Sequence, residues 1–219
     1  MTKKLAIKLR KFRRICPIAG YKEEAIKVGA PVVVETDRGV EYGQIVSFPK
    51  GLPKATSRDV RLKKVLRYAT DEDLKIAEEL DLKEDEAAGL GMAKVKEYEL
   101  PIKIVNVEYI FDFKRVVFYY KLEEKRKKGP NLKELSRDLA SELKARVDMR
   151  EINPRDEARI FGGLGPCGRS LCCASWLGKP KHVTVKMVKE LGLSISPTKT
   201  SGVCGRLMCC FAYEPKGEP

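Results

Sequence analysis

The sequence predicts an α+β protein with a small β-barrel-like N-terminal module, a linking helix, and an α+β C-terminal module that carries a cysteine-rich helical lobe. Three observations support this class. Short apolar runs with the period of strands fill the first 70 residues, a helical pattern follows, and six of the seven cysteines lie beyond residue 161. We therefore divide the chain into residues 1–70, 71–96, 97–160 and 161–219.

The first module is expected to be rich in strands. Apolar residues recur at every second position over residues 5–9, and residues 31–36 and 40–46 form two further candidate strands. The Asp37-Arg38-Gly39 sequence between the latter two is typical of a tight turn. Several short strands that close on themselves make a barrel-like module. Cys16 stands apart from the other cysteines and is interpreted as a structural thiol.

The net charge of +13 is concentrated in this first module. The formal charge is +11 over residues 1–70, −3 over residues 71–160 and +5 over residues 161–219. A basic surface suits a polyanion such as RNA, because neutralising phosphates releases counterions. A solvated, lysine-rich surface that aids solubility is the alternative. The candidate nucleic-acid contacts are Lys8, Arg10, Lys11, Arg13 and Arg14.

Residues 71–96 are predicted to form the linking helix. Thr70 or Asp71 can cap it, and Glu72 and Asp73 lie where the helix dipole is positive. The apolar stripe of this helix is thin, and two glycines weaken its end. Its default role is to connect two modules, and a role in receiving a partner is the alternative.

The second module is predicted to pack one helix on one sheet. Residues 101–110 and 114–122 are rich in β-branched and aromatic residues and indicate a hairpin. Leucines spaced by three and four predict a helix over residues 131–143. Residues 147–152 form a further candidate strand.

A cysteine cassette with the pattern Cys-Gly-Arg-x-x-Cys-Cys occurs twice, over residues 167–173 and 204–210. Corresponding cysteines lie 37 residues apart. Thiolate is a soft ligand that selects zinc, copper(I) or iron–sulfur clusters. Arg169 and Arg206 are interpreted as neighbours of the bound group that favour the thiolate form and offset negative charge. The candidate ligands are Cys167, Cys172, Cys173, Cys204, Cys209 and Cys210.

The spacing of these cysteines differs from the paired Cys-x-x-Cys knuckles of common zinc sites. Adjacent residues on a helix point about 100° apart, so a vicinal pair does not easily share one ion. Iron–sulfur proteins tolerate more varied spacing. Buried structural thiols and thiol redox chemistry remain alternatives.

No catalytic constellation is visible, and we expect a non-catalytic protein. His182 is the single histidine, and no serine has a recognisable base and orienting residue. The chain contains no run of about 18 apolar residues, so no transmembrane segment is expected. The basic start of the chain lacks the apolar core of a signal peptide, which favours a cytoplasmic location with reduced thiols.

Three stretches carry a family resemblance: residues 32–43, residues 155–173 and residues 197–210. With them the chain resembles the bacterial YaaT family, also called RicT, which is built on a polymerase-suppressor-type C-terminal domain. The resemblance covers nearly the whole chain, and the six cassette cysteines match the family's set. One departure is that Ala87, Ala88 and Gly89 stand where relatives often have a cysteine.

This resemblance implies a cytoplasmic regulatory subunit. Relatives form a complex with two small helical partner proteins of the RicA and RicF type, and that complex carries iron–sulfur clusters, here expected to be 4Fe–4S, with zinc as the alternative. The complex helps the endoribonuclease RNase Y to process and turn over messenger RNA, which affects sporulation, competence and biofilm formation. Six thiols exceed the needs of one cubane, so sharing with partner subunits is implied. A zinc-binding or metal-free nucleic-acid-binding module is the alternative function.

Overall fold

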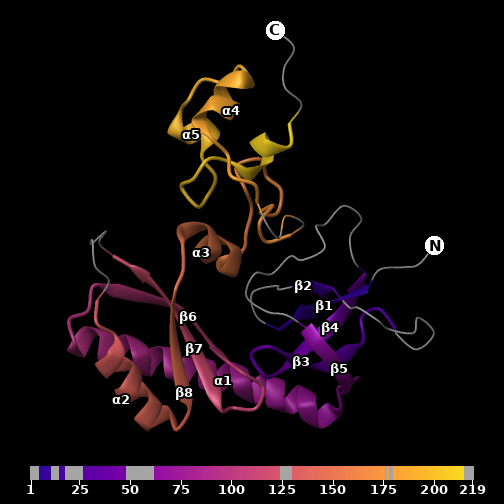
Figure 1. Cartoon of the computed structure of the whole chain (residues 1–219), viewed down its shortest axis with the longest axis vertical. Helices are drawn as coiled ribbons and strands as arrows, with labels where there is room; N and C mark the ends of the chain where they lie inside the picture. Colours follow the sequence, from indigo (N-terminus) through magenta and orange to yellow (C-terminus); the bar gives the residue numbers. More distant parts are fainter. Residues whose placement is uncertain are drawn as a thin grey trace.

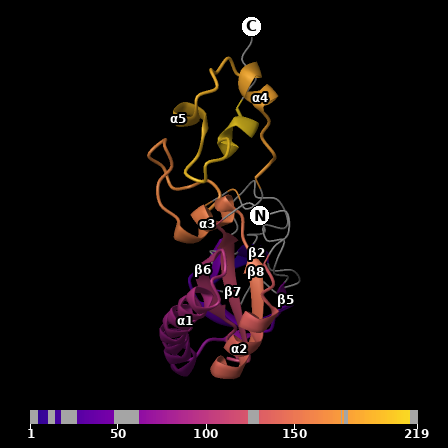
Figure 2. The same cartoon turned by 90° about the vertical axis from the view of Figure 1, so that its left-hand side faces the viewer.

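The fold is that of a computed structural model, which describes residues 5–10, 15–17, 27–47, 62–123, 130–175, 177 and 180–214. Two sheets lie side by side along one long helix, α1 (Asp71–Glu97), and the cysteine-rich lobe projects from the side opposite that helix (Figure 1). A view turned by 90° places α3 (Pro154–Phe161) between the sheets and the lobe (Figure 2). The α+β class is confirmed.

The first sheet contains five antiparallel strands in the order β2-β1-β4-β3-β5. Its small core is formed by apolar side chains at alternate positions of β1 and β3, together with Ile45 of β4. The strands are β1 (Leu5–Leu9), β2 (Ile15–Pro17), β3 (Pro31–Thr36), β4 (Val40–Ser47) and β5 (Leu62–Tyr68). The three strands expected at residues 5–9, 31–36 and 40–46 are confirmed.

The expectation of a barrel is wrong, because this sheet is open. Strands β2 and β5 are its two edges and do not pair with each other in the described part of the chain. Closure requires edge strands with matching tilt and register, and β2 offers only three residues to such a pairing. Register shifts in the β3–β5 pair add a local twist at the other edge.

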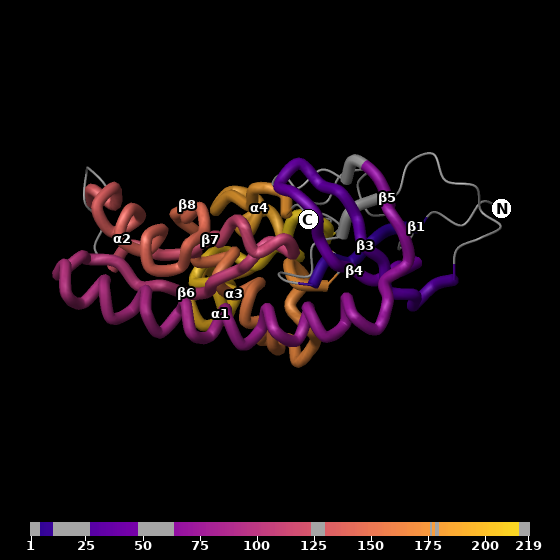
Figure 3. The backbone as a smooth tube through the Cα atoms, turned by 90° about the horizontal axis from the view of Figure 1, so that it is seen from below, coloured from indigo at the N-terminus to yellow at the C-terminus, as the bar shows by residue number. Residues whose placement is uncertain are grey.

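The long helix α1 begins with a complete capping box. The Thr70 hydroxyl accepts the backbone N–H of Asp73, and the Asp73 carboxylate accepts the backbone N–H of Thr70 at 2.8 Å. Arg67, at the end of β5, donates to the same carboxylate. Viewed from below, the helix runs beneath both sheets (Figure 3). The linking helix predicted from the sequence is therefore confirmed almost to the residue.

The second sheet is formed by β6 (Ile102–Tyr109), β7 (Arg115–Leu122) and β8 (Arg146–Glu151). Strands β6 and β7 form the predicted antiparallel hairpin, and β8 lies parallel to β7. A parallel neighbour needs a crossover, which α2 (Lys133–Leu143) provides. Helices α1 and α2 cover one face of this sheet, where Phe118, Leu80 and Leu139 are buried in the main core.

Arg38, in the β3–β4 turn, fastens the two sheets together. Its guanidinium donates to both oxygens of Glu108 on β6, at 2.9 and 3.0 Å, and to both oxygens of Glu41 on β4, at 3.0 and 2.9 Å. The Tyr119 hydroxyl donates to Glu108 at 2.7 Å. Burial alone would lower the pKa of Arg38, but the charges of Glu108 and Glu41 outweigh it and raise that pKa. The arginine therefore stays charged.

The long helix also ties to the first sheet. Arg10, just after β1, donates to Asp81 and Glu84 of α1. The buried Glu84 carboxylate in turn accepts the backbone N–H of Tyr109 on β6 at 2.8 Å. One carboxylate of α1 thus contacts both sheets.

The lobe is less helical than expected. Helix α3 was not anticipated as a helix, and beyond it the described residues form only α4 (Val185–Glu190), α5 (Pro197–Thr200) and a 3-10 helix, η2 (Cys209–Ala212), with turns between them. Val183, Val188 and Phe211 form a small core there. In the described parts of the chain, no helix has both the length and the apolar character needed to cross a bilayer.

Candidate metal centre

The two cysteine cassettes fold in the same way. In the first, the N–H of Gly165 donates to the carbonyl of Arg169 at 2.7 Å, and the N–H of Gly168 donates to the carbonyl of Gly165 at 2.9 Å. The second repeats both bonds 37 residues later, at 2.8 and 2.9 Å. An isolated bridge, Leu164 with Ser170 and Ser201 with Leu207, closes each turn. The sequence repeat is therefore a structural repeat.

The glycine after the first cysteine of each cassette is required by the backbone. Gly168 has a φ of +73° and Gly205 a φ of +70°, in the left-handed region that side chains disfavour. This conformation reverses the chain directly after Cys167 and Cys204. Each cassette thereby presents its first thiol from a tight turn and its vicinal pair from the segment that follows.

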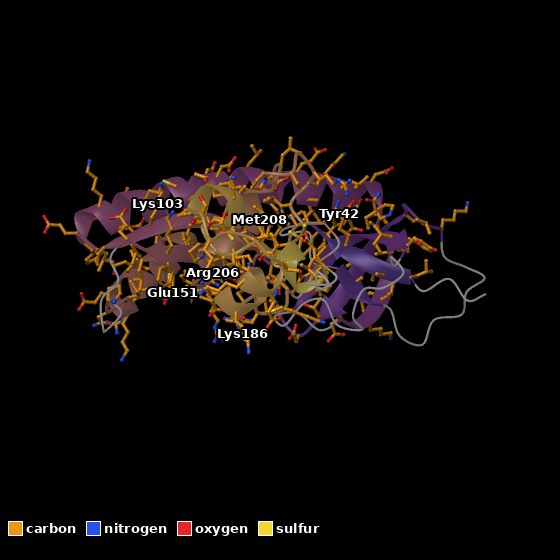
Figure 4. The ribbon with its side chains drawn as sticks, turned by 90° about the horizontal axis from the view of Figure 1, so that it is seen from above. Tyr42, Lys103, Glu151, Lys186, Arg206 and Met208 are labelled. Atoms are coloured by element: carbon orange, nitrogen blue, oxygen red, sulfur yellow. The ribbon has the colours of Figure 1, made fainter. Side chains whose placement is uncertain are left out.

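All six cassette cysteines line one pocket of about 70 Å³. Its other walls include Arg155 and Ala158 of α3 and the apolar side chains of Leu171, Leu207 and Met208. Seen from above, Arg206 and Met208 of the second cassette lie over the middle of the molecule, between Lys103 and Glu151 on one side and Tyr42 on the other (Figure 4). The two copies thus converge on a shared, mainly apolar space.

No three of the described histidine, cysteine, aspartate and glutamate side chains are grouped as a ligand set for a metal ion. The six cassette cysteines nevertheless line the same pocket.

Burial raises the pKa of three of these thiols. For Cys173 the main cause is burial, followed by the nearby Cys204, while the charges of Arg159 and Arg155 oppose the rise. Burial also raises the pKa of Cys209 and Cys210, with contributions from thiols of the first cassette. Thiols of both cassettes contribute to these shifts because they line the same pocket. Without a bound cation these thiols favour the neutral form.

Helix α3 brings cationic side chains to the pocket. The Asn153 side chain caps it by accepting the N–H of Arg155 at 2.9 Å and that of Asp156 at 3.1 Å, and Pro154 occupies its first turn. Arg155 lines the pocket, and its Nε is buried without a hydrogen-bond partner among the described residues. Sequence reasoning missed this arginine. The Asn-Pro start followed by arginines four residues apart was the available signal.

The arginines chosen from the sequence lie elsewhere. Arg169 and Arg206 are exposed and do not line the pocket, although their backbone carbonyls accept the glycine N–H groups of the cassette turns. Among the candidate nucleic-acid contacts, Lys8 is exposed and Arg10 pairs with α1. Lys11, Arg13 and Arg14 lie outside the described residues, as does the side chain of Cys16.

The residues of the pocket fit an iron–sulfur group. Six thiols supply soft ligands. The buried Nε–H of Arg155 can donate a hydrogen bond to a negatively charged sulfur atom. The exposed His182 does not line the pocket. Among the residues that line the pocket, the cysteine thiols are soft ligands.

Comparison with known proteins gives two family matches and two similar proteins. Residues 63–152 match the PSP1 C-terminal conserved region, and residues 182–217 match the third domain of PSP1-like proteins. The stage 0 sporulation protein YaaT of Bacillus subtilis is 46% identical over 185 residues, which cover 84% of this chain and 65% of YaaT. An uncharacterised Schizosaccharomyces pombe protein is 30% identical over 150 residues, which cover 56% of this chain and 19% of that protein.

The first family match begins within β5 and takes α1 and the second sheet together as one unit. No solved structure matches the chain. The matched part of the chain spans 65% of the length of YaaT. The two cassettes lie in the last quarter of the present chain. These matches confirm the resemblance to the YaaT family: residues 63–152 match the PSP1 C-terminal conserved region, and the chain is 46% identical to YaaT over most of its length.

Proposed function

We propose that this chain is a non-catalytic regulatory subunit that holds an iron–sulfur cluster, of the 4Fe–4S type, between its two cysteine cassettes. The observation that carries the proposal is the convergence of all six cassette cysteines on one pocket. Four cysteines suffice for such a cluster. The remaining two are available to partner subunits.

The sequence spacing of the cassette cysteines differs from the paired Cys-x-x-Cys knuckles of common zinc sites, which favours a cluster over one zinc ion. When bound, an iron–sulfur cluster supplies a redox-active centre and a cross-link between protein segments. The protein's own part is positional. The glycine turns set the first thiol of each cassette, and the apolar walls formed by Leu171, Leu207 and Met208 limit access of water to the sulfur atoms.

The surface beside the pocket suits a protein partner. Val203, which lines the pocket, and Leu164, which precedes the pocket residue Gly165, are 61% and 65% exposed, and Phe161 at the end of α3 is 70% exposed. Large exposed apolar side chains that gather in one place are typical of interaction sites. We assign this surface to helical partners of the RicA and RicF type, in a complex that modulates RNase Y-dependent processing of messenger RNA. The relative's name, which refers to sporulation, agrees with a regulatory role.

The test is anaerobic purification of the full chain with assays for iron and acid-labile sulfide. We expect iron and sulfide in equal amounts and a brown chromophore. Changing all six cassette cysteines to serine should abolish all three signals, whereas Cys16→Ser, outside the cassettes, should leave them intact. A colourless chain that contains zinc, or neither metal, would overturn the proposal.

A further inference from the structure

Arg155 occupies a fixed position at the wall of the cysteine pocket. The cap formed by Asn153 and the proline that follows it set the start of α3, which places Arg155 in the first turn of the helix. Ala158, three residues later and so on the same face, also lines the pocket. The helix therefore directs this face, and the arginine on it, towards the cassettes.

The guanidinium of Arg155 has a donor without a partner. Its Nε is buried and makes no hydrogen bond within the described residues. A buried donor that belongs to a charged group is costly to leave unsatisfied, so native proteins rarely keep one without a reason. A pocket lined by six thiols offers such a reason, because sulfur that carries negative charge accepts N–H donors.

Arg155 lines the same pocket as the cysteines of both cassettes. Arg169 and Arg206 are exposed to solvent, which screens their charges, and neither lines the pocket. Among these three arginines, the pocket geometry singles out the one from α3.

We propose that Arg155 is a positioning residue that donates its Nε–H to the sulfur atoms of the group held in the pocket and raises the reduction potential of that group. The inference rests on the proposed function. Reduction adds an electron and makes the group more negative, and a fixed cation with an N–H donor stabilises the more negative state. Removing this cation should therefore make the group harder to reduce.

The experiment measures the midpoint potential of the reconstituted, full-length chain by spectroelectrochemistry, together with its iron content. Arg155→Gln should lower the ratio of reduced to oxidised cluster at least tenfold at a fixed potential, which for one electron corresponds to a shift of about 59 mV. Arg206→Gln is the matched control, since it removes the same charge from an exposed position of the second cassette, and it should leave the potential unchanged.

Arg155→Lys keeps the charge but lacks the Nε–H, so its potential should fall between those of the wild type and Arg155→Gln. If Arg155→Gln fails to retain iron, the lysine variant decides: a potential below the wild type supports the inference, and an unchanged potential overturns it. An iron-loaded Arg155→Gln chain with the wild-type potential overturns this inference and leaves the proposed function standing. A wild-type chain without iron and sulfide overturns both.

Discussion

At the scale of single residues, Gly91 shows why a helix can keep a residue that disfavours helices. A Cβ at this position would lie 2.7 Å from both the Ile104 Cδ1 and the Phe118 Cε1 atoms. The backbone of α1 therefore approaches the second sheet closely, and the sheet holds the helix in place where its sequence is weak. Gly89, two residues earlier, has open space around its Cα.

The two glycines should respond in opposite directions to alanine. Gly91→Ala should destabilise the protein by about 1–3 kcal/mol, because the added methyl group overpacks the core. Gly89→Ala should stabilise it by up to about 1 kcal/mol through helix propensity. Urea unfolding followed by circular dichroism measures both. Stabilisation by Gly91→Ala would contradict the close approach of helix and sheet.

Asp73 is a residue whose ionisation should be visible in the pH dependence of stability. A hydrogen bond from Arg67, with further bonds from Thr70, lowers the pKa of Asp73 from its ordinary value of 3.8 to about 2, against the effect of burial. Because the folded-state pKa is lower, the stabilising contribution is present above pH 4 and is lost as the pH falls towards 2. Asp73→Asn should therefore lower stability at pH 7 and flatten its fall between pH 4 and pH 2.

Chemical unfolding of wild type and Asp73→Asn at pH 7, 4 and 2 checks this expectation. Asp71→Asn is the control, because Asp71 is exposed in the same first turn of α1. Equal loss of stability on acidification in wild type and Asp73→Asn would contradict the role assigned to the carboxylate.

At the scale of elements, local periodicity predicted most of what the structure contains. The β6–β7 hairpin and α1 follow from residue patterns that need no knowledge of the rest of the chain. The open first sheet did not follow, because alternation along a strand does not determine whether two distant edges meet. Helix α3 was missed because it is short, half of its eight residues are charged, and it contributes no fully buried side chain.

The candidate site likewise has features that the sequence predicted and features that it did not. The repeated cysteines were evident from the sequence, and the repeat implied two similar turns, which the hydrogen bonds of the cassettes display. Which arginine faces the thiols was not evident, since Arg169 and Arg206 adjoin the cysteines in sequence while Arg155 adjoins them only in space. Proximity along the chain was a poor guide because the tight turns direct those two side chains to solvent.

At the scale of the whole molecule, the Arg38 network makes the two sheets one body. Arg38→Ala would remove the guanidinium that pairs with the buried carboxylates of Glu41 and Glu108, and we expect a loss of about 3–5 kcal/mol. Arg115→Ala, which removes a half-exposed partner of Asp148, should cost less than about 1 kcal/mol.

Denaturant unfolding of both variants measures the difference. Adding Glu41→Gln and Glu108→Gln to an Arg38→Met chain should recover part of the loss, because no unpaired charge then remains buried. A cost for Arg38→Ala no larger than that for Arg115→Ala would show that the two sheets do not depend on this contact.

Helix α3 connects the second sheet to the cysteine pocket. One of its side chains, Arg155, lines the pocket. Another, Glu157, accepts a hydrogen bond from the ammonium group of Lys121 on β7 at 2.6 Å. Because β7 is the middle strand of the second sheet, the wall of the cysteine pocket and the centre of that sheet are joined through a single short helix, and a displacement of the helix at one end would strain its contact at the other.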